Sequence, residues 1–153
     1  MSGDAPVLPR ELLLAIYQQA REEFPNECCG YVLGQGEEAQ QVRCVNVMDK
    51  YHRVDPQTYP RTAATAYMLD YKDIRRLDES LGSERPATVI YHSHPRVGAY
   101  FSEEDTRAAL ATHWPVDYLV VDVQEDEVVE ALLFRRFDDE RYEQIARFDG
   151  APV

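Results

Sequence analysis

Apolar residues recur along the chain at two different spacings, and these predict helices interleaved with strands. After Pro9, the residues Leu12, Ile16 and Ala20 follow one another at four-residue intervals, which is typical of an amphipathic helix that runs to about Glu23. The same analysis gives two further helices, and shorter apolar runs predict strands. The predicted helices are 66–81 and 102–112, and the predicted strands are 28–33, 40–47, 87–91, 116–123 and 128–137. This order predicts one α/β domain with a mixed central sheet.

Three other stretches complete the predicted organisation. Residues 87–91 are an almost unbroken apolar run, which is typical of a strand buried on both faces. Residues 48–60 combine prolines with scattered charges, and we expect a long loop there that ends in a short strand. We predict a single domain over 1–153, with a core of about 8–137 and a C-terminal tail of about 138–153.

The charge balance excludes two classes of partner. Lysine and arginine number 16 and aspartate and glutamate 28, for a net charge of -12. A general binder of nucleic acid or of an anionic membrane needs a positive surface, so we expect neither partner. The acidity itself fits either an ordinary solvated surface or a salt-rich cytosol.

Cysteine usage and hydropathy predict a cytoplasmic protein. No stretch approaches the ~20 consecutive apolar residues of a membrane span, and residues 1–10 lack the features of a signal peptide. Cys28, Cys29 and Cys44 are an odd number without a CxxC pair. We therefore expect reduced thiols, with Cys28 and Cys29 as small core residues rather than nucleophiles.

The candidate chemistry lies in His92-Ser93-His94-Pro95 and in the helix that follows. Residues two apart on a strand point to the same face, so both imidazoles can reach one ion. The first turn of the helix at 102–112 can present Asp105 to the same point. Two imidazoles and one carboxylate leave the fourth position of a tetrahedral zinc ion open, as in catalytic zinc sites.

Each piece also has a simpler structural interpretation. The two histidines could be partly exposed polar residues of a strand, and Ser102 with Asp105 could form an N-cap and an acidic first turn. We favour the metal site because one short strand–loop–helix path brings all three ligands together. Ser102 can cap the helix and still face the site with its hydroxyl proton.

A hydrolytic zinc site also needs a base that takes a proton from water and passes one to the leaving group. Glu27, in the turn before the strand at 28–33, is the favoured candidate. Spacing alone does not separate it from Glu22 or Glu23.

The sequence then resembles a known motif. A glutamate upstream, then H[ST]HP, six residues and SxxD is the JAMM motif of the JAB/MPN metallopeptidases. Its positions are filled here by Glu27, His92, His94, Pro95, Ser102 and Asp105. The stretch PNECCGYVLG around the glutamate is similar to the prokaryotic branch of that family. The resemblance implies a cytidine-deaminase-like α/β sandwich, with a mixed, curved β-sheet flanked by helices.

The resemblance also implies a role for each residue. His92, His94 and Asp105 would bind Zn2+, Glu27 would deprotonate the attacking water and protonate the departing amine, and Ser102 would donate a hydrogen bond to the oxyanion. The reaction would be hydrolysis of an amide or isopeptide bond. Zinc deaminases need HxE and PCxxC, and neither pattern occurs here.

The compact chain resembles bacterial members that act on ubiquitin-like (β-grasp) sulfur-carrier proteins. We therefore expect cleavage after the C-terminal Gly-Gly of such a carrier, and the carrier or its adduct as the partner. The alternative is a module that binds a ubiquitin-like protein with little or no peptidase activity. A DNA-repair-associated JAB domain is disfavoured by the charge of -12 and by the lack of an N-terminal helix-hairpin-helix segment. The sequence makes no prediction of oligomeric state.

Overall fold

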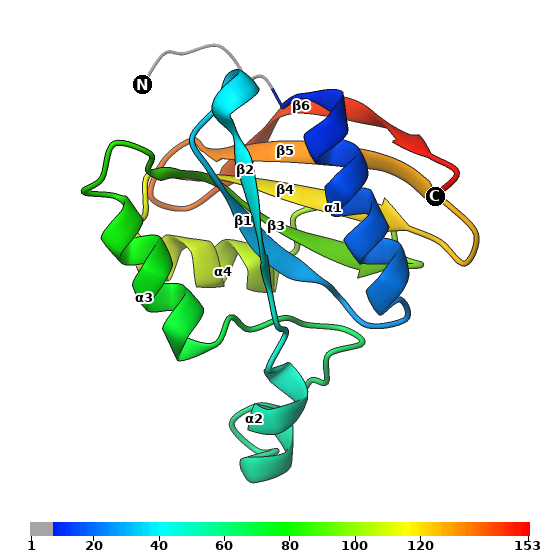
Figure 1. The fold of residues 1–153 in the computed structure, drawn as a ribbon. Coiled ribbons are helices and arrows are strands. Elements are labelled where there is room, and N and C mark those ends of the chain that lie inside the picture. The colour runs from blue at the N-terminus through cyan, green and yellow to red at the C-terminus, as the bar shows by residue number, and fades with distance from the viewer. Residues whose placement is uncertain (1–7) are drawn as a thin grey trace.

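The computed structural model describes residues 8–153, which build a six-stranded mixed sheet with helices on both faces (Figure 1). The strand order is β2-β1-β3-β4-β5-β6, in which β3 and β4 are parallel and all other neighbours are antiparallel. The helices are α1 (Arg10–Glu23), α2 (Met48–Val54), α3 (Tyr71–Ser80) and α4 (Glu103–Thr112), with a 3-10 turn η1 (Gly36–Glu38). The strands are β1 (Cys29–Leu33), β2 (Gln40–Cys44), β3 (Ala87–Pro95), β4 (Asp117–Val123), β5 (Val128–Arg136) and β6 (Tyr142–Ala151). The predicted α/β class with a mixed, helix-flanked sheet is confirmed.

The two faces of the sheet carry separate apolar cores. α1 crosses one face, where its Ile16 packs with Tyr91 of β3. α3 and α4 cover the other face, where Leu77 packs with Ile90. Successive residues of a strand point to opposite faces, so His92 and His94 share the α3/α4 side with Ile90. No helix among residues 8–153 is long and apolar enough to cross a membrane.

β3 is the strand that positions the site. Nearly all of its residues are buried, as expected for a strand covered on both faces. It is longer than the predicted 87–91, because its parallel pairing with β4 continues to Pro95 opposite Val123. Both histidines therefore lie within the strand, with His92 opposite Cys29 of β1.

The segment predicted as a long loop contains α2 instead. Met48 is the only buried residue of this seven-residue helix, so the sequence carries no apolar stripe that would reveal it. A side-chain oxygen of Asn46 accepts a hydrogen bond from the backbone N–H of Met48 at 3.0 Å. The short strand expected near residue 60 does not form. The predicted helix 66–81 begins only at Tyr71, because Leu69 is held in an extended bridge with Asn46.

The sheet extends further than the predicted core of about 8–137. Residues 142–151, within the predicted tail of about 138–153, form edge strand β6, which pairs with β5 along its length. Its apolar residues Ile145 and Phe148 are only partly buried, and a register shift interrupts the pairing at Leu133 and Phe134. These features weaken the period-two pattern by which a strand is recognised.

Candidate active site

Three potential metal-binding atoms form a nearly equilateral triangle. His92 Nε2 and His94 Nε2 lie 3.1 Å apart, and each lies 3.2 Å from Asp105 Oδ2. Tetrahedral zinc at ~2.0–2.1 Å from nitrogen and oxygen ligands separates those ligands by ~3.3 Å. The distances between these atoms therefore fit three protein ligands of one zinc ion. The fold brings together the three residues that the sequence indicated, His92, His94 and Asp105.

The start of α4 explains why Asp105 points to the histidines. The Ser102 Oγ accepts a hydrogen bond from the Asp105 N–H at 3.0 Å, and Asp105 Oδ2 accepts one from the Ser102 N–H at 3.1 Å. This is a reciprocal capping box, so Ser102 and Asp105 also form the N-cap and acidic first turn that the sequence allowed as the simpler interpretation. One carboxylate oxygen caps the helix and faces both imidazoles.

Glu27 reaches the same site from the start of β1. It is 5% exposed, and one of its carboxylate oxygens lies within 4.8 Å of a ring nitrogen of His92 and of a ring nitrogen of His94. Its backbone is fixed on both sides: the N–H donates to the Ala63 carbonyl at 2.8 Å, and the carbonyl accepts from the Asn46 side-chain amide at 2.9 Å.

The two alternative glutamates lie elsewhere. Glu22 is exposed on α1 and pairs with Arg43 at 2.9 Å, while Glu23 accepts a hydrogen bond from Gln19. The structure therefore separates Glu27 from the neighbours that spacing alone left equivalent.

Burial sets the protonation of these groups. It raises the pKa of the Glu27 carboxyl to about 8, while His94 lowers this pKa and Asp105 raises it. Burial alone would raise the pKa of Asp105, but the two imidazoles outweigh it and hold this pKa well below its usual range. Burial also lowers the pKa of His92. A neutral imidazole is the form that binds a metal, so His92 suits that task.

Aromatic rings hold both imidazoles in place. Tyr67 stacks on His92 with ring centroids 4.4 Å apart, and Tyr100 meets His94 edge-on at 5.0 Å. His94 Nδ1 lies 3.1 Å from the Gly98 carbonyl oxygen. His92 Nδ1 finds no hydrogen-bond partner among residues 8–153 although it is fully buried. Such groups are rare in folded proteins outside sites with a special role.

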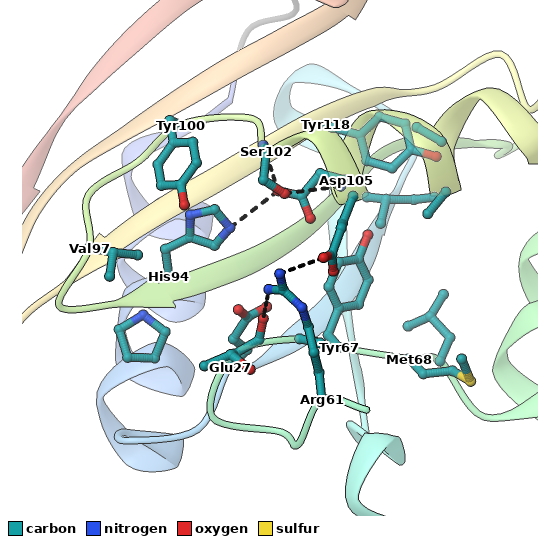
Figure 2. Close-up of a pocket in the computed structure, with 18 of the residues that line it drawn as sticks. Glu27, Arg61, Tyr67, Met68, His94, Val97, Tyr100, Ser102, Asp105 and Tyr118 are labelled. Carbon is teal, nitrogen blue, oxygen red and sulfur yellow. Dashed lines mark hydrogen bonds and ion pairs between the residues drawn. The ribbon is translucent and has the colours of Figure 1, made fainter. Parts of the chain in front are cut away.

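A cavity of about 610 Å³ opens beside these residues (Figure 2). Glu27, His94, Ser102 and Asp105 line one part of it. Figure 2 shows Met68 and Tyr118 on the side of Arg61 away from Glu27. The apolar part of the cavity wall includes Met68, Ile74, Ala109, Trp114 and Tyr118. An apolar cavity with a few convergent polar groups is the usual form of a binding site for a small group or an extended chain.

Comparison with known proteins identifies the family. The family described as prokaryotic homologs of the JAB domain matches residues 9–136, well over half of the chain. The chain belongs to this family. It is 27% identical over 133 residues to proteins of Mycobacterium bovis and Mycobacterium tuberculosis that are named CysO-cysteine peptidase. The match spans 86% of this chain and 83% of those relatives.

Solved structures share the fold of this JAB domain. A solution structure of a protein from Desulfitobacterium hafniense matches with a TM-score of 0.56 at 16% identity, over 88% of this chain and 86% of that one. A solution structure of a protein from Salinibacter ruber gives the same TM-score and identity, over 92% and 88%. At this identity the likeness concerns the fold alone.

The cysteines of this JAB domain are core residues. Cys28, the residue before β1, packs in the core beneath α1, and Cys29, the first residue of β1, packs in the core on the opposite face. Burial raises the pKa of Cys28 to about 12 and also raises that of Cys29. A reactive thiol needs a lowered pKa, so neither has the properties of a nucleophile.

Several residues of the site carry no signal in the sequence. Tyr67 lies in a stretch predicted as helix, and Tyr100 lies in the loop between the two halves of the motif. Arg61 directly follows the segment 48–60 predicted as a loop, and Asn46 lies in the predicted strand 40–47. Only the folded chain brings these four side chains to the cavity or to Glu27.

Proposed function

We propose that this JAB domain is a zinc-dependent metallopeptidase. It hydrolyses the amide or isopeptide bond after the C-terminal Gly-Gly of a ubiquitin-like (β-grasp) sulfur-carrier protein. The observation that carries the proposal is the triangle of His92, His94 and Asp105 with the Glu27 carboxylate beside it. The relatives named CysO-cysteine peptidase support a carrier adduct as the substrate.

The metal-binding role is assigned to His92, His94 and Asp105. When bound, a zinc ion supplies a Lewis acid that polarises the scissile carbonyl and lowers the pKa of water. Three protein ligands leave one position for substrate or water, as in catalytic rather than structural sites. The fixed cap at Asp105, the ring stacked on His92 and the ring set edge-on to His94 hold the ligand atoms in position without further rearrangement.

Glu27 moves the protons. In this mechanism its carboxylate takes a proton from the attacking water and then delivers it to the nitrogen of the departing amine. A carboxyl whose pKa is raised by burial is a stronger base and, once protonated, an acid available near neutral pH. A cation in the site would lower this pKa and so favour the carboxylate at the start of the reaction.

Ser102 stabilises the charge that develops on the carbonyl oxygen. Its Oγ already accepts the Asp105 N–H, which leaves the hydroxyl hydrogen to donate. Because Ser102 lines the same cavity as Glu27 and His94, that hydrogen can reach the oxyanion.

A Gly-Gly tail suits the entrance to the site. Val97 and Tyr100 line the cavity beside His94 and are both more than half exposed, at 63% and 51%. A chain that passes between them and the reacting groups must bring its backbone close, which glycine permits because it has no side chain.

The experiment compares wild type with Glu27→Gln on a β-grasp carrier extended beyond its Gly-Gly end. We expect about one zinc per chain in both proteins, and cleavage by wild type that falls by at least about 100-fold in the variant. Glu22→Gln, which changes an exposed glutamate five residues earlier, is the control and keeps full activity.

Other outcomes separate the alternatives. Stoichiometric zinc and carrier binding without cleavage by wild type would favour the binding module. Failure to take up zinc at neutral pH would remove the proposed mechanism altogether.

A further inference from the structure

Arg61 is the feature of the cavity that the proposed mechanism does not use. Among the described residues that line the cavity it is the only arginine or lysine, and the same wall carries the three carboxylates of Glu27, Glu104 and Asp105. The whole chain carries a net charge of -12. An anionic group that entered here would be repelled unless it met this guanidinium.

We propose that Arg61 binds the free α-carboxylate of the residue that is released, so that this domain removes a single C-terminal residue rather than cutting a lysine isopeptide bond. This inference rests on the proposed function, because it concerns the leaving group of that reaction.

The fold holds Arg61 next to the residue that would protonate the leaving amine. Ala63, two residues further on, accepts the Glu27 N–H at 2.8 Å and donates its own N–H to Asp49 Oδ1 at 2.7 Å. The charge of Arg61 is close enough to lower the pKa of Glu27. Figure 2 shows its side chain extending into the cavity between Glu27 and Tyr67.

The present contacts of Arg61 leave donors for a ligand. One terminal nitrogen donates to the Thr65 carbonyl at 3.3 Å, and the other pairs with Glu104. Both side chains of that ion pair are almost half exposed, at 48% and 44%, so solvent screens it and a competing carboxylate can displace it. A guanidinium has five N–H donors in a planar fork, which matches a carboxylate with two parallel hydrogen bonds.

The two possible leaving groups, a single residue and a lysine side chain, differ in the group that they place beside Glu27 and Arg61. In a single released residue the carboxylate is one carbon away from the nitrogen that Glu27 protonates, so it must lie beside Glu27 and needs a neighbouring cation. A lysine isopeptide would place an aliphatic chain there instead. The wall of the same cavity includes the apolar residues Met68, Ile74 and Trp114, against which the side chain of the released residue can pack.

The test uses two substrates that differ in one charge: a β-grasp carrier extended after Gly-Gly by one leucine, as the free acid and as the amide. We expect wild type to prefer the acid in kcat/KM by about 10- to 100-fold, the range of a charge-assisted pair. Arg61→Gln should bring this ratio close to one by slowing the acid. Arg61→Lys should keep part of the preference, since charge remains without the fork.

Arg107→Gln is the matched control, because Arg107 is exposed on the same helix as Glu104 and is not part of the cavity wall. It should keep the wild-type ratio. A wild-type ratio near one, or an Arg61→Gln variant that slows acid and amide equally, would overturn the role of Arg61 while leaving the peptidase intact.

If wild type cleaved neither substrate, the proposed function would fail, and binding would decide the role of Arg61. Tighter binding of the acid than of the amide to zinc-loaded Glu27→Gln protein, lost when Arg61→Gln is added, would support it. Equal binding of the two would overturn it.

Discussion

Buried polar side chains are arranged differently on the two faces of β3. On the α1 side, the Gln41 side-chain amide donates to the Tyr91 hydroxyl at 3.0 Å and to Gln19 at 3.1 Å, and the Tyr91 hydroxyl donates to Gln19. On the other side, His92 and His94 bring two nitrogens close together, and His92 Nδ1 has no partner among residues 8–153. One side closes its polar groups into an internal hydrogen-bond network, whereas the other gathers three potential ligand atoms around one point.

This contrast separates stability from function along a single strand. A closed network of polar groups fixes the packing of a core, while several potential ligand atoms gathered around one point suit a metal ion. Alternate residues of β3 serve the two purposes. Changes on the α1 side should therefore alter the free energy of unfolding, and changes on the α3/α4 side should alter metal binding and catalysis.

The largest effect is expected for Asp105→Asn, on the functional side. Zinc content should fall well below one per chain and kcat/KM by at least about 1,000-fold, which corresponds to about 4 kcal/mol, because the ligand loses its charge. Asparagine still accepts the Ser102 N–H, so the helix cap is kept and the variant should fold, while loss of the carboxylate beside the two imidazoles lowers the free energy of unfolding without metal. Zinc analysis measures the metal content, and urea denaturation measures the free energy of unfolding. If the Asp105→Asn variant kept one zinc per chain and wild-type activity, the assignment of metal binding and catalysis to this side of β3 would be wrong.

The next effect is expected for Gly30→Ala, on the structural side. A Cβ at this position would lie 2.2 Å from the Tyr91 hydroxyl and 2.5 Å from the Val42 carbonyl oxygen. Such overpacking should lower the free energy of unfolding by about 3 kcal/mol, while the folded fraction keeps its zinc. Gly82→Ala is the control, since nothing lies within 4 Å of the added carbon. Equal urea midpoints for Gly30→Ala and Gly82→Ala would show that β1 and β2 shift to accommodate the added Cβ without loss of stability.

The smallest effects sharpen the comparison at Ser102, whose hydroxyl caps α4 and is also the proposed oxyanion donor. Ser102→Ala and Ser102→Gly both remove the hydroxyl donor, so each should lower kcat/KM by about 100-fold. Alanine at an N-cap should cost about 1 kcal/mol of stability and glycine only a few tenths. Cleavage rates and thermal unfolding of both variants test this. If the activity losses followed the stability losses, the hydroxyl would serve only as a cap.

The local pattern of the sequence was sufficient for the residues on regular elements. His92 and His94 share a face because strand residues alternate, and Asp105 occupies the third position of a capped helix, so the three could be grouped without a structure. The strand β3 itself was predicted too short, because its last residues are polar and owe their place to pairing with β4.

The segment between β2 and α3 could not be predicted, because one side chain organises it. Asn46 donates to the carbonyls of Glu27 and Ala66 and accepts from the N–H groups of Met48 and Met68. These contacts connect residues up to 22 apart in the chain. No local propensity encodes them, so α2 and the place of Arg61 follow from tertiary structure.

The reciprocal cap between Ser102 and Asp105 has a consequence for how the metal would arrive. The Asp105 oxygen that we propose as the third ligand is already ordered by helix formation, so its conformational entropy is lost on folding and not on metal binding. Metal-dependent folding, as in zinc fingers, is the opposite case. This JAB domain should therefore exchange its metal as a rigid receptor, with the same backbone before and after loading.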